Sequence, residues 1–261
     1  MFTSKVLAMN REEVQYLAEN MAGRKKDKDE MAAETDLLSF MDGVPTIEIS
    51  GSITRQKSLM TMLGGGTSLG AISEALAAVE EAEEIDQVLL DIDSPGGTAA
   101  GISSVTGQMR DMETETIAFA SGQMLSAAYW IGSAADQVFA SPNAMVGSIG
   151  VYSLVRSQSD MEKEAGIDTR VVRSTEKKAV EHPSEPISEE AVKKQQRIVD
   201  KIHENFVESV ATNRNLSTEF VNDTMADGDV RVGDEAEEEG FVDGTATLDE
   251  VFDNVTFDED S

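Results

Sequence analysis

The sequence TIAFASGQMLSAAYWIGSAADQVFASPNAMVGSIGVY, residues 116–152, decides the fold and contains the first candidate functional residue. Its opening apolar run, 116–120, predicts a buried strand, and the Ser121-Gly122 pair predicts a turn after it. Ser126 then begins a helix of small residues, and a second short strand and a tight Gly-Ser-Ile-Gly loop close the unit. A serine between a strand and a helix is either an N-cap, its commoner role, or a nucleophile.

The composition restricts the class of protein. The 261 residues suffice for one large domain or two small ones. The 50 acidic and 21 basic residues give a net charge of −29, which argues against nucleic-acid binding and favours a highly solvated, salt-adapted surface. Cysteine is absent and only His182 and His203 are available, so we expect no disulfide, metal site or cofactor.

No apolar run approaches the roughly 18 residues that a membrane-spanning helix needs. The apolar run at 6–9 has four residues and is too short for the core of a signal peptide. We therefore expect no membrane span and a cytoplasmic location.

Strands and helices alternate along the chain, which predicts βαβ units and a mostly parallel sheet. Outside the opening stretch, predicted strands lie at 46–50, 87–92 and 168–173. Predicted helices begin at Asn10 and after the capping pair Thr67-Ser68, and cover 98–112, 151–166, 188–213 and 218–225. An acidic helix is expected between the segments 229–232 and 241–242. The fold class is therefore α/β. We divide the chain into an N-terminal helix with a charged linker (1–35), one large domain (36–255) and an acidic tail (256–261).

A serine nucleophile needs a general base, an orienting group and an oxyanion hole. His182 lies in a Pro-containing loop and His203 lies within a helix, so neither is a good base. Lysine is the other base used with serine. Lys177 and Lys178 directly follow the predicted strand at 168–173, although most such pairs are surface residues.

The sequence Asp-Ser-Pro-Gly-Gly at 93–97 follows a predicted strand. Glycines let a backbone approach a ligand closely, and amides exposed in this way can bind an oxyanion. Functional sites in open α/β sheets lie at the carboxyl ends of the strands. On its own, however, Pro-Gly-Gly is also an ordinary turn.

Taken together, these segments resemble the signal peptide peptidase A family of serine–lysine endopeptidases, which have the Clp-protease/crotonase fold. The matching segments are GVPTIEISGSI at 43–53, VLLDIDSPGG at 88–97, SGQMLSAAYWIGSAADQVFASPNAMVGSIGV at 121–151 and DGDVRVGDEAEEEGFVD at 227–243. Lys178 follows Ser126 by 52 residues, as the spacing of the family implies. The resemblance therefore implies a ββα superhelix with a mostly parallel sheet.

The resemblance also implies a role for each site residue. Ser126 would be the nucleophile and Lys178 the general base, with the Ser148 hydroxyl orienting the lysine amine. The oxyanion would be held by backbone amides of Gly97 or Gly96 and of Ala127. Thr175 replaces a glycine that the family often shows before its lysine. If this segment is extended, only one of Lys177 and Lys178 can point at the serine, and the spacing favours Lys178.

A lysine must be neutral to act as a base. The ordinary lysine pKa is about 10.4, and burial is the factor that lowers it. We therefore expect Lys178 to be buried in the assembled enzyme. The resemblance implies a homo-oligomer in which subunits complete the sites of their neighbours.

Two branches of the family fit the sequence. Bacteriophage head maturation proteases of the lambda protein C type cleave scaffold and capsid proteins, whereas cellular signal peptide peptidases degrade signal peptides. VLAMNREEVQYLAENMAG at 6–23 and GSITRQKSLMTMLGGGTSLGAISEAL at 51–76 resemble the phage branch, which implies work in the host cytoplasm or inside a prohead. Two readings of another class stay open: a crotonase-type acyl-CoA enzyme and an inactive structural assembly factor.

Overall fold

A computed structural model describes residues 37–41, 44–56, 65–82 and 85–256. The expected helix from Asn10 and the charged linker lie outside these residues. The chain forms two compact units, one from the residues up to 149 and from 207 onward, the other from Gly150–Phe206. The first unit contains every strand of the described residues.

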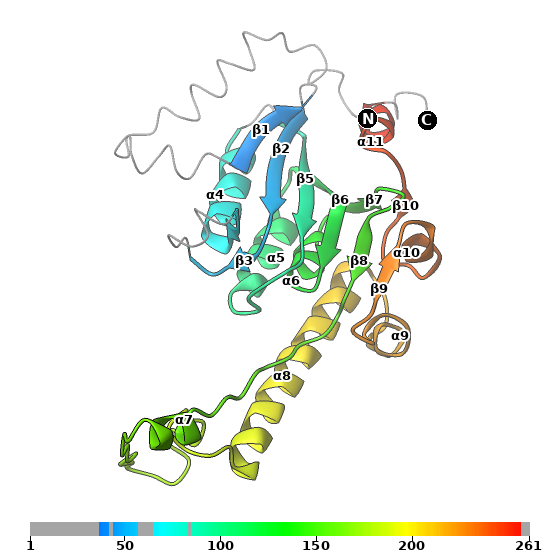
Figure 1. Cartoon of the computed structure of the whole chain (residues 1–261). Coiled ribbons are helices and arrows are strands. Elements are labelled where there is room, and N and C mark those ends of the chain that lie inside the picture. Colours follow the sequence, from blue (N-terminus) through cyan, green and yellow to red (C-terminus); the bar gives the residue numbers. More distant parts are fainter. Residues whose placement is uncertain (1–36, 42–43, 57–64, 83–84, 257–261) are drawn as a thin grey trace, which may run out of the picture. The chain divides into compact units, whose positions relative to one another are not determined.

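The first unit is built on a mixed, mostly parallel sheet with the strand order β1-β2-β5-β6-β7-β10 (Figure 1). Strand β1 pairs antiparallel with β2, the remaining neighbours along this path are parallel, and β8 connects β6 to the antiparallel β9. The bounds are β1 Leu38–Met41, β2 Val44–Ser50, β5 Gln87–Ser94, β6 Glu115–Leu125, β7 Gln137–Ala140, β8 Met145–Gly147, β9 Val230–Val232 and β10 Gly244–Thr245. A separate two-stranded sheet joins β3 Ile53–Thr54 to β4 Thr67–Ser68. The predicted α/β class with a mostly parallel sheet is confirmed.

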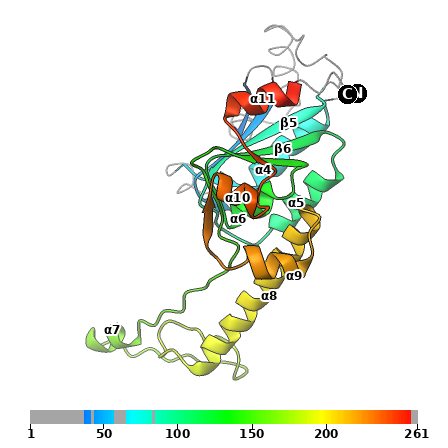
Figure 2. The same cartoon turned by 90° about the vertical axis from the view of Figure 1, so that its right-hand side faces the viewer.

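Helices cover both faces of this sheet. The helices of the first unit are α4 Leu69–Glu80, α5 Ile102–Asp111, α6 Ala127–Gly132, α9 Thr218–Phe220, the π-helix η2 Val221–Met225, α10 Asp234–Glu238 and α11 Leu248–Thr256. Ser68 caps α4 as expected, because its Oγ accepts a hydrogen bond of 3.2 Å from the Ala71 N–H. Figure 2 shows α11 and α5 on opposite faces of the sheet. The predicted acidic tail lies outside the described residues, apart from Thr256 at the end of α11.

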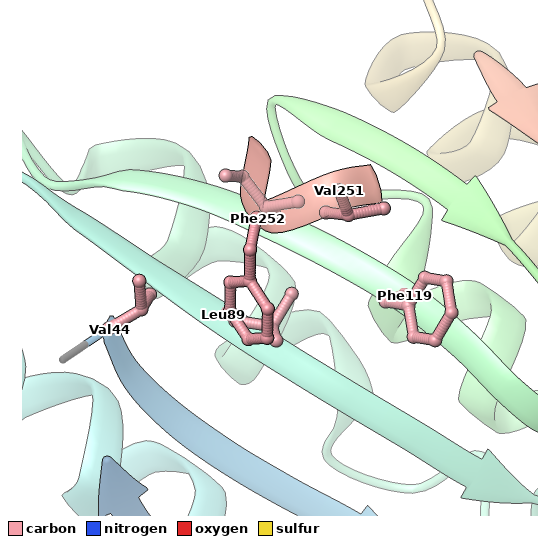
Figure 3. Packing of buried hydrophobic residues seen from close by; sticks show 6 residues of the cluster. Val44, Leu89, Phe119, Val251 and Phe252 are labelled. Atoms are coloured by element: carbon pink, nitrogen blue, oxygen red, sulfur yellow. The ribbon is translucent and has the colours of Figure 1, made fainter. Parts of the chain in front are cut away.

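The C-terminal helix α11 contributes to the core. Its Val251 and Phe252 pack on the sheet residues Val44, Leu89 and Phe119, with Ile117 completing the cluster (Figure 3). The opposite faces of β5 and β6 are also buried, which explains why these strands read as continuous apolar runs rather than alternating ones.

The turn predicted at Ser121-Gly122 is wrong, because β6 continues through it to Leu125. A Cβ on Gly122 would lie 2.5 Å from Asp93 Oδ1, and the same oxygen accepts a 3.0 Å hydrogen bond from the Gln123 N–H. The glycine therefore allows Asp93 to approach the strand. Beyond this point β6 pairs with β8, so the strand reaches Ser126.

The second unit differs most from the sequence-based expectation. Its helices are α7 Ser159–Glu164 and the first part of α8 Glu189–Asn213. The predicted helix at 151–166 is thus confined to α7, and the Ser157 hydroxyl accepts a hydrogen bond of 3.2 Å from the Ser159 N–H at its first residue. The predicted strand at 168–173 is absent from the described structure, because no neighbouring segment pairs with it and Val172 is 96% exposed. In the first unit, the acidic helix expected between 229–232 and 241–242 is present as α10, and β10 begins at Gly244.

A bidentate ion pair between Arg214 and Asp243 stabilises the C-terminal segment next to strand β7. Arg214 donates to both carboxylate oxygens of Asp243, at 2.9 and 2.7 Å. The same carboxylate accepts from the Val138 N–H at 2.8 Å. Burial acts to raise the pKa of Asp243, but the hydrogen bonds and charge of Arg214 outweigh it and the pKa lies below its ordinary value.

We expect Asp243→Asn to lower the free energy of unfolding at pH 7 by about 1–2 kcal/mol, allowing for solvent screening of a half-exposed carboxylate. Because the folded pKa lies below the unfolded one, this stability is present above the ordinary aspartate pKa of about 3.9 and is lost as the pH falls through the folded pKa. Urea titrations of both proteins at pH 7 and pH 3.5 check this, with Asp249→Asn, at an exposed position of α11, as the control. A deficit as large at pH 3.5 as at pH 7 would contradict it.

Candidate active site

Ser126 lies between the end of β6 and the start of α6 with φ 53° and ψ −117°. Its N–H donates to the Gly147 carbonyl at 2.8 Å, and its own carbonyl accepts from the Trp130 N–H at 2.9 Å. Within the described residues its side chain makes no capping hydrogen bond. The N-cap role therefore does not account for this serine, and its backbone occupies a region that ordinary side chains rarely adopt.

Strained backbone of this kind clusters at functional sites. In the described part of the chain, the non-glycine residues with positive φ are Ser126, Ser148, Ala179 and Asn215. The first two are predicted site residues, and the third directly follows Lys178. Two of the four strained positions are therefore site residues that the sequence predicts.

The glycine loop after β5 lies directly against Ser126. A Cβ on Gly96 would be 2.9 Å from Ser126 Cβ, 2.9 Å from the Ala127 nitrogen and 2.6 Å from the Leu125 carbonyl oxygen. Gly96 also has φ +93°. Only a glycine fits there, and its absence of a side chain is what brings the loop onto the strand-to-helix turn.

Hydrogen bonds hold this loop in place. The Gly96 N–H donates to Ser94 Oγ at 3.1 Å, and that hydroxyl donates to the Gly51 carbonyl at 2.6 Å. Strand β3 also holds the loop: the Ile53 N–H donates to the Gly96 carbonyl at 2.8 Å, and the Ile53 carbonyl accepts from the Thr98 N–H at 2.9 Å. The Gly96 amide is thus already used.

Two amides next to Ser126 are free to bind a ligand. Among the described residues, neither the Gly97 N–H nor the Ala127 N–H donates to an acceptor. Ala127 is the first residue of α6, where the helix leaves its N–H groups unsatisfied. Of the amides predicted to bind an oxyanion, Gly97 and Ala127 are therefore available, whereas Gly96 is not.

Ser148 is linked to Ser126 through the peptide group between Gly147 and Ser148. The Gly147 carbonyl accepts the Ser126 N–H, and Ser148 follows in the chain with φ 53°. The Ser148 N–H donates to the Asp229 carbonyl at 2.7 Å. The structure thus brings Ser126, Ala127, Ser148 and the 96–97 loop together in the first unit.

Lys178 belongs to the second unit, where it lies in a run of turns rather than in an extended segment. Its N–H donates to the Thr175 carbonyl at 3.1 Å. The premise that Lys177 and Lys178 alternate along a strand is therefore wrong. Both side chains are exposed in the single chain, and their position relative to Ser126 is not defined.

The lysine-bearing loop is braced by charged residues. Glu181 accepts from Lys194 Nζ at 2.8 Å and from Gln195 Nε2 at 3.1 Å, both on α8. Arg173 and Glu185 form an ion pair across the base of the loop. The hydrogen bond from Lys194 lowers the pKa of Glu181, so this carboxylate stays ionised and its charge is balanced within the unit.

Among the described residues, no group of three or more His, Cys, Asp or Glu side chains could hold a metal ion. His182 Nδ1 accepts a hydrogen bond from the Ser184 N–H at 3.2 Å. No described helix is both long and apolar enough to cross a membrane.

The sequence profile of peptidase family S49 matches residues 108–259, more than half of the chain, including Ser126, Ser148 and Lys178. This chain belongs to peptidase family S49. The S49 proteins are serine peptidases, in keeping with the strained serine and free amides. The glycine loop at 93–97 precedes the matched residues.

Curated relatives of this S49 chain come from both cells and phages. A candidate signal peptide peptidase SppA of Enterococcus faecium is 28% identical over 69% of this chain and 53% of its own length. Capsid assembly protease C of Escherichia phage lambda is 26% identical over 78% of this chain and 46% of its own length. The chain thus spans about half the length of these relatives. Their similar identities do not separate the two branches that the sequence suggested.

Among solved structures, a mutant ClpP1 of Listeria monocytogenes shares the fold with a TM-score of 0.50. It is 16% identical, and the match covers 78% of this S49 chain and 92% of ClpP1. The predicted Clp-protease-like fold is confirmed.

Sequence reasoning missed the residues behind the site. Phe241, Tyr129 and Arg231 pack together under the Gly147–Ser148 turn. The available signal was the match of 227–243 to the closing segment of the family, which says nothing of contacts. The positive φ of Ala179 left no sequence signal at all.

We expect Gly96→Ala to lower kcat/KM for a peptide by about 10²-fold, because the new methyl group would displace the amides beside Ser126. Gly166→Ala is the matched control, since Gly166 also has positive φ but no atom lies within 4 Å of the place that its new methyl group would occupy. Peptide-cleavage kinetics with thermal melts separate site damage from unfolding. Equal losses in both variants would show that backbone strain alone, and not contact with Ser126, is responsible.

Proposed function

We propose that this chain is a serine endopeptidase in which Ser126 is the nucleophile and Lys178 the general base. The observation that carries the proposal is the contact of the glycine loop with the turn at Ser126, which leaves the Gly97 and Ala127 amides free beside the serine. Membership of family S49 supports the same chemistry. The pairing with Lys178 rests on the resemblance and its spacing.

In the proposed reaction, Ser126 Oγ attacks the peptide carbonyl carbon and passes its proton to the neutral Lys178 amine. The carbonyl oxygen becomes an oxyanion, which the Gly97 and Ala127 N–H groups stabilise. The intermediate collapses, the C–N bond breaks and Lys178 returns the proton to the leaving amine. Lys178 then takes a proton from a water molecule, whose oxygen attacks the Ser126 ester. The bond between Ser126 Oγ and the acyl carbon breaks, Lys178 returns the proton to Ser126 Oγ, and the carboxyl product leaves.

The proposal requires an oligomer. A lysine acts as a base only in its neutral form, which burial favours, and the Lys178 side chain is exposed in the single chain. A second copy that covers the lysine loop would supply the burial that keeps the amine neutral. We therefore propose a homo-oligomer whose subunits complete each other's sites.

For the biological substrate we favour scaffold and capsid proteins cleaved during viral assembly. The similarity to capsid assembly protease C covers 78% of this chain, and segments 6–23 and 51–76 resemble the phage branch. The relative from Enterococcus faecium keeps degradation of signal peptides as the second candidate. An inactive assembly factor or an acyl-CoA enzyme would have the fold without peptide cleavage.

Digestion of unfolded casein by the purified oligomer, followed by mass spectrometry of the new termini, tests the proposed class of reaction. We expect internal cleavage, with small residues such as Ala or Gly at the cleaved position as the resemblance implies. An oligomer that leaves casein and candidate capsid substrates intact would favour the structural factor. Parallel digests of scaffold proteins and signal peptides from the same genome then separate the two branches.

A further inference from the structure

The Phe241 ring lies directly behind the loop that carries Ser148. Phe241 is fully buried, and a Cβ on Gly147 would be 3.0 Å from its Cε1 atom. Gly147 has φ +107°, a conformation that suits glycine. The ring therefore packs directly on the Gly147 backbone. The carbonyl of this residue accepts the Ser126 N–H, and Ser148 is the next residue in the chain.

Neighbouring side chains hold Phe241 on two sides. Its ring lies 5.5 Å from that of Tyr129, tilted by 57°, and Tyr129 follows Ser126 by one turn of α6. The Tyr129 hydroxyl donates to the Phe241 carbonyl at 2.9 Å. Arg231 places its guanidinium carbon 5.6 Å from the centre of the ring. Both contacts are of the kind that fixes the orientation of an aromatic ring.

Arg231 also links the two ends of the segment 227–239. Its guanidinium donates to Asp227 at 3.0 Å and to Glu239 at 2.7 Å. Between these residues, the Asp229 carbonyl accepts the Ser148 N–H, and β9 pairs with β8. Residues 227–241 thus contact the Gly147–Ser148 turn at three points: through the pairing of β9 with β8, the Asp229 carbonyl and the Phe241 ring.

We propose that Phe241 is a positioning residue of the active site, which holds the Gly147–Ser148 turn and through it the Ser126 backbone and the Ser148 hydroxyl. This inference rests on the proposed serine–lysine function. Besides the side chains of Tyr129 and Arg231, this ring packs on the backbone of Gly147, whose carbonyl accepts the Ser126 N–H. Small shifts of that peptide therefore move the nucleophile and the orienting hydroxyl together.

The test is peptide cleavage by Phe241→Leu compared with Phe119→Leu. Phe119 is also buried and lies on the sheet, in the cluster with Val251 and Phe252. Its replacement therefore removes a buried aromatic ring that is not part of the contacts with the Gly147–Ser148 turn. We expect Phe241→Leu to lower kcat about 10-fold or more, with KM within about twofold. We also expect the acidic limb of its pH–rate profile to shift in the same direction as that of Ser148→Ala.

A double-mutant cycle isolates the route of the effect. If Phe241 acts through Ser148, Phe241→Leu should cost less than about threefold in kcat once Ser148 is alanine. Tyr129→Phe, which removes only the hydrogen bond to the Phe241 carbonyl, should give a smaller shift of the same limb. It replaces Phe241→Leu in the cycle if the latter does not fold.

The outcomes distinguish this inference from the function on which it rests. Suppose that the wild type cleaves peptides through Ser126. The positioning role is then wrong if Phe241→Leu and Phe119→Leu have the same kinetics. It is also wrong if the fold-losses in kcat of Phe241→Leu and Ser148→Ala simply multiply in the double mutant. If the wild type cleaves nothing, the proposed function itself fails.

Discussion

Ser126→Ala is expected to abolish peptide cleavage, with a loss of about 10⁴-fold or more in kcat, and to leave the fold and the oligomer intact. The hydroxyl supplies the attacking oxygen, and losing a nucleophile removes the whole covalent route. Stability should change little, since the Ser126 side chain makes no capping hydrogen bond in the described structure. Initial rates on a peptide substrate, with thermal melts, measure both effects.

Ser121→Ala is the matched control, because Ser121 is an exposed serine five residues earlier on the same strand. It should keep most of its activity. Cleavage that persists in Ser126→Ala protein would end the role of Ser126 as nucleophile and would point to a different residue or to a contaminating protease.

Lys178→Met is expected to lower kcat by about 10³-fold, within the range of a lost general base. Methionine keeps the length and apolar stem of the side chain but cannot accept a proton. Lys177→Met is the matched control, since the two lysines are adjacent, exposed and in the same turn. It should retain activity within about fivefold.

The comparison is made on oligomers of equal size, measured by light scattering, because the proposed site depends on assembly. The reverse pattern, with Lys177→Met inactive and Lys178→Met active, would move the base by one position. Full activity in both variants would remove lysine from the mechanism.

Local patterns allowed much of the fold to be predicted from the sequence. Strand β5 and helices α4 and α8 follow from apolar runs, a serine cap and helical periodicity, which act within a few residues. The local pattern also marked Ser126, where a buried strand gives way to a helix of small residues, as either an N-cap or a nucleophile, and the family resemblance then favoured the nucleophile.

The failures have a common physical cause, since each depends on a partner distant in the sequence. Gly122 was predicted to turn the chain, but it remains in the strand because Asp93 packs against it. Residues 168–173 have strand-like composition but no paired neighbour in the described chain. The Gly96 amide, an alternative oxyanion donor in the prediction, is occupied by Ser94 Oγ, which itself donates to the distant Gly51 carbonyl. None of these contacts has a local signature.

The most direct test of the serine–lysine account is covalent trapping of the oligomer with a fluorophosphonate, followed by peptide mapping and a pH series of the trapping rate. The account predicts one adduct, on Ser126, whose formation slows as the pH falls and becomes at least about 10²-fold slower in Lys178→Met protein. An adduct on another residue, or an unchanged rate in Lys178→Met protein, would contradict it.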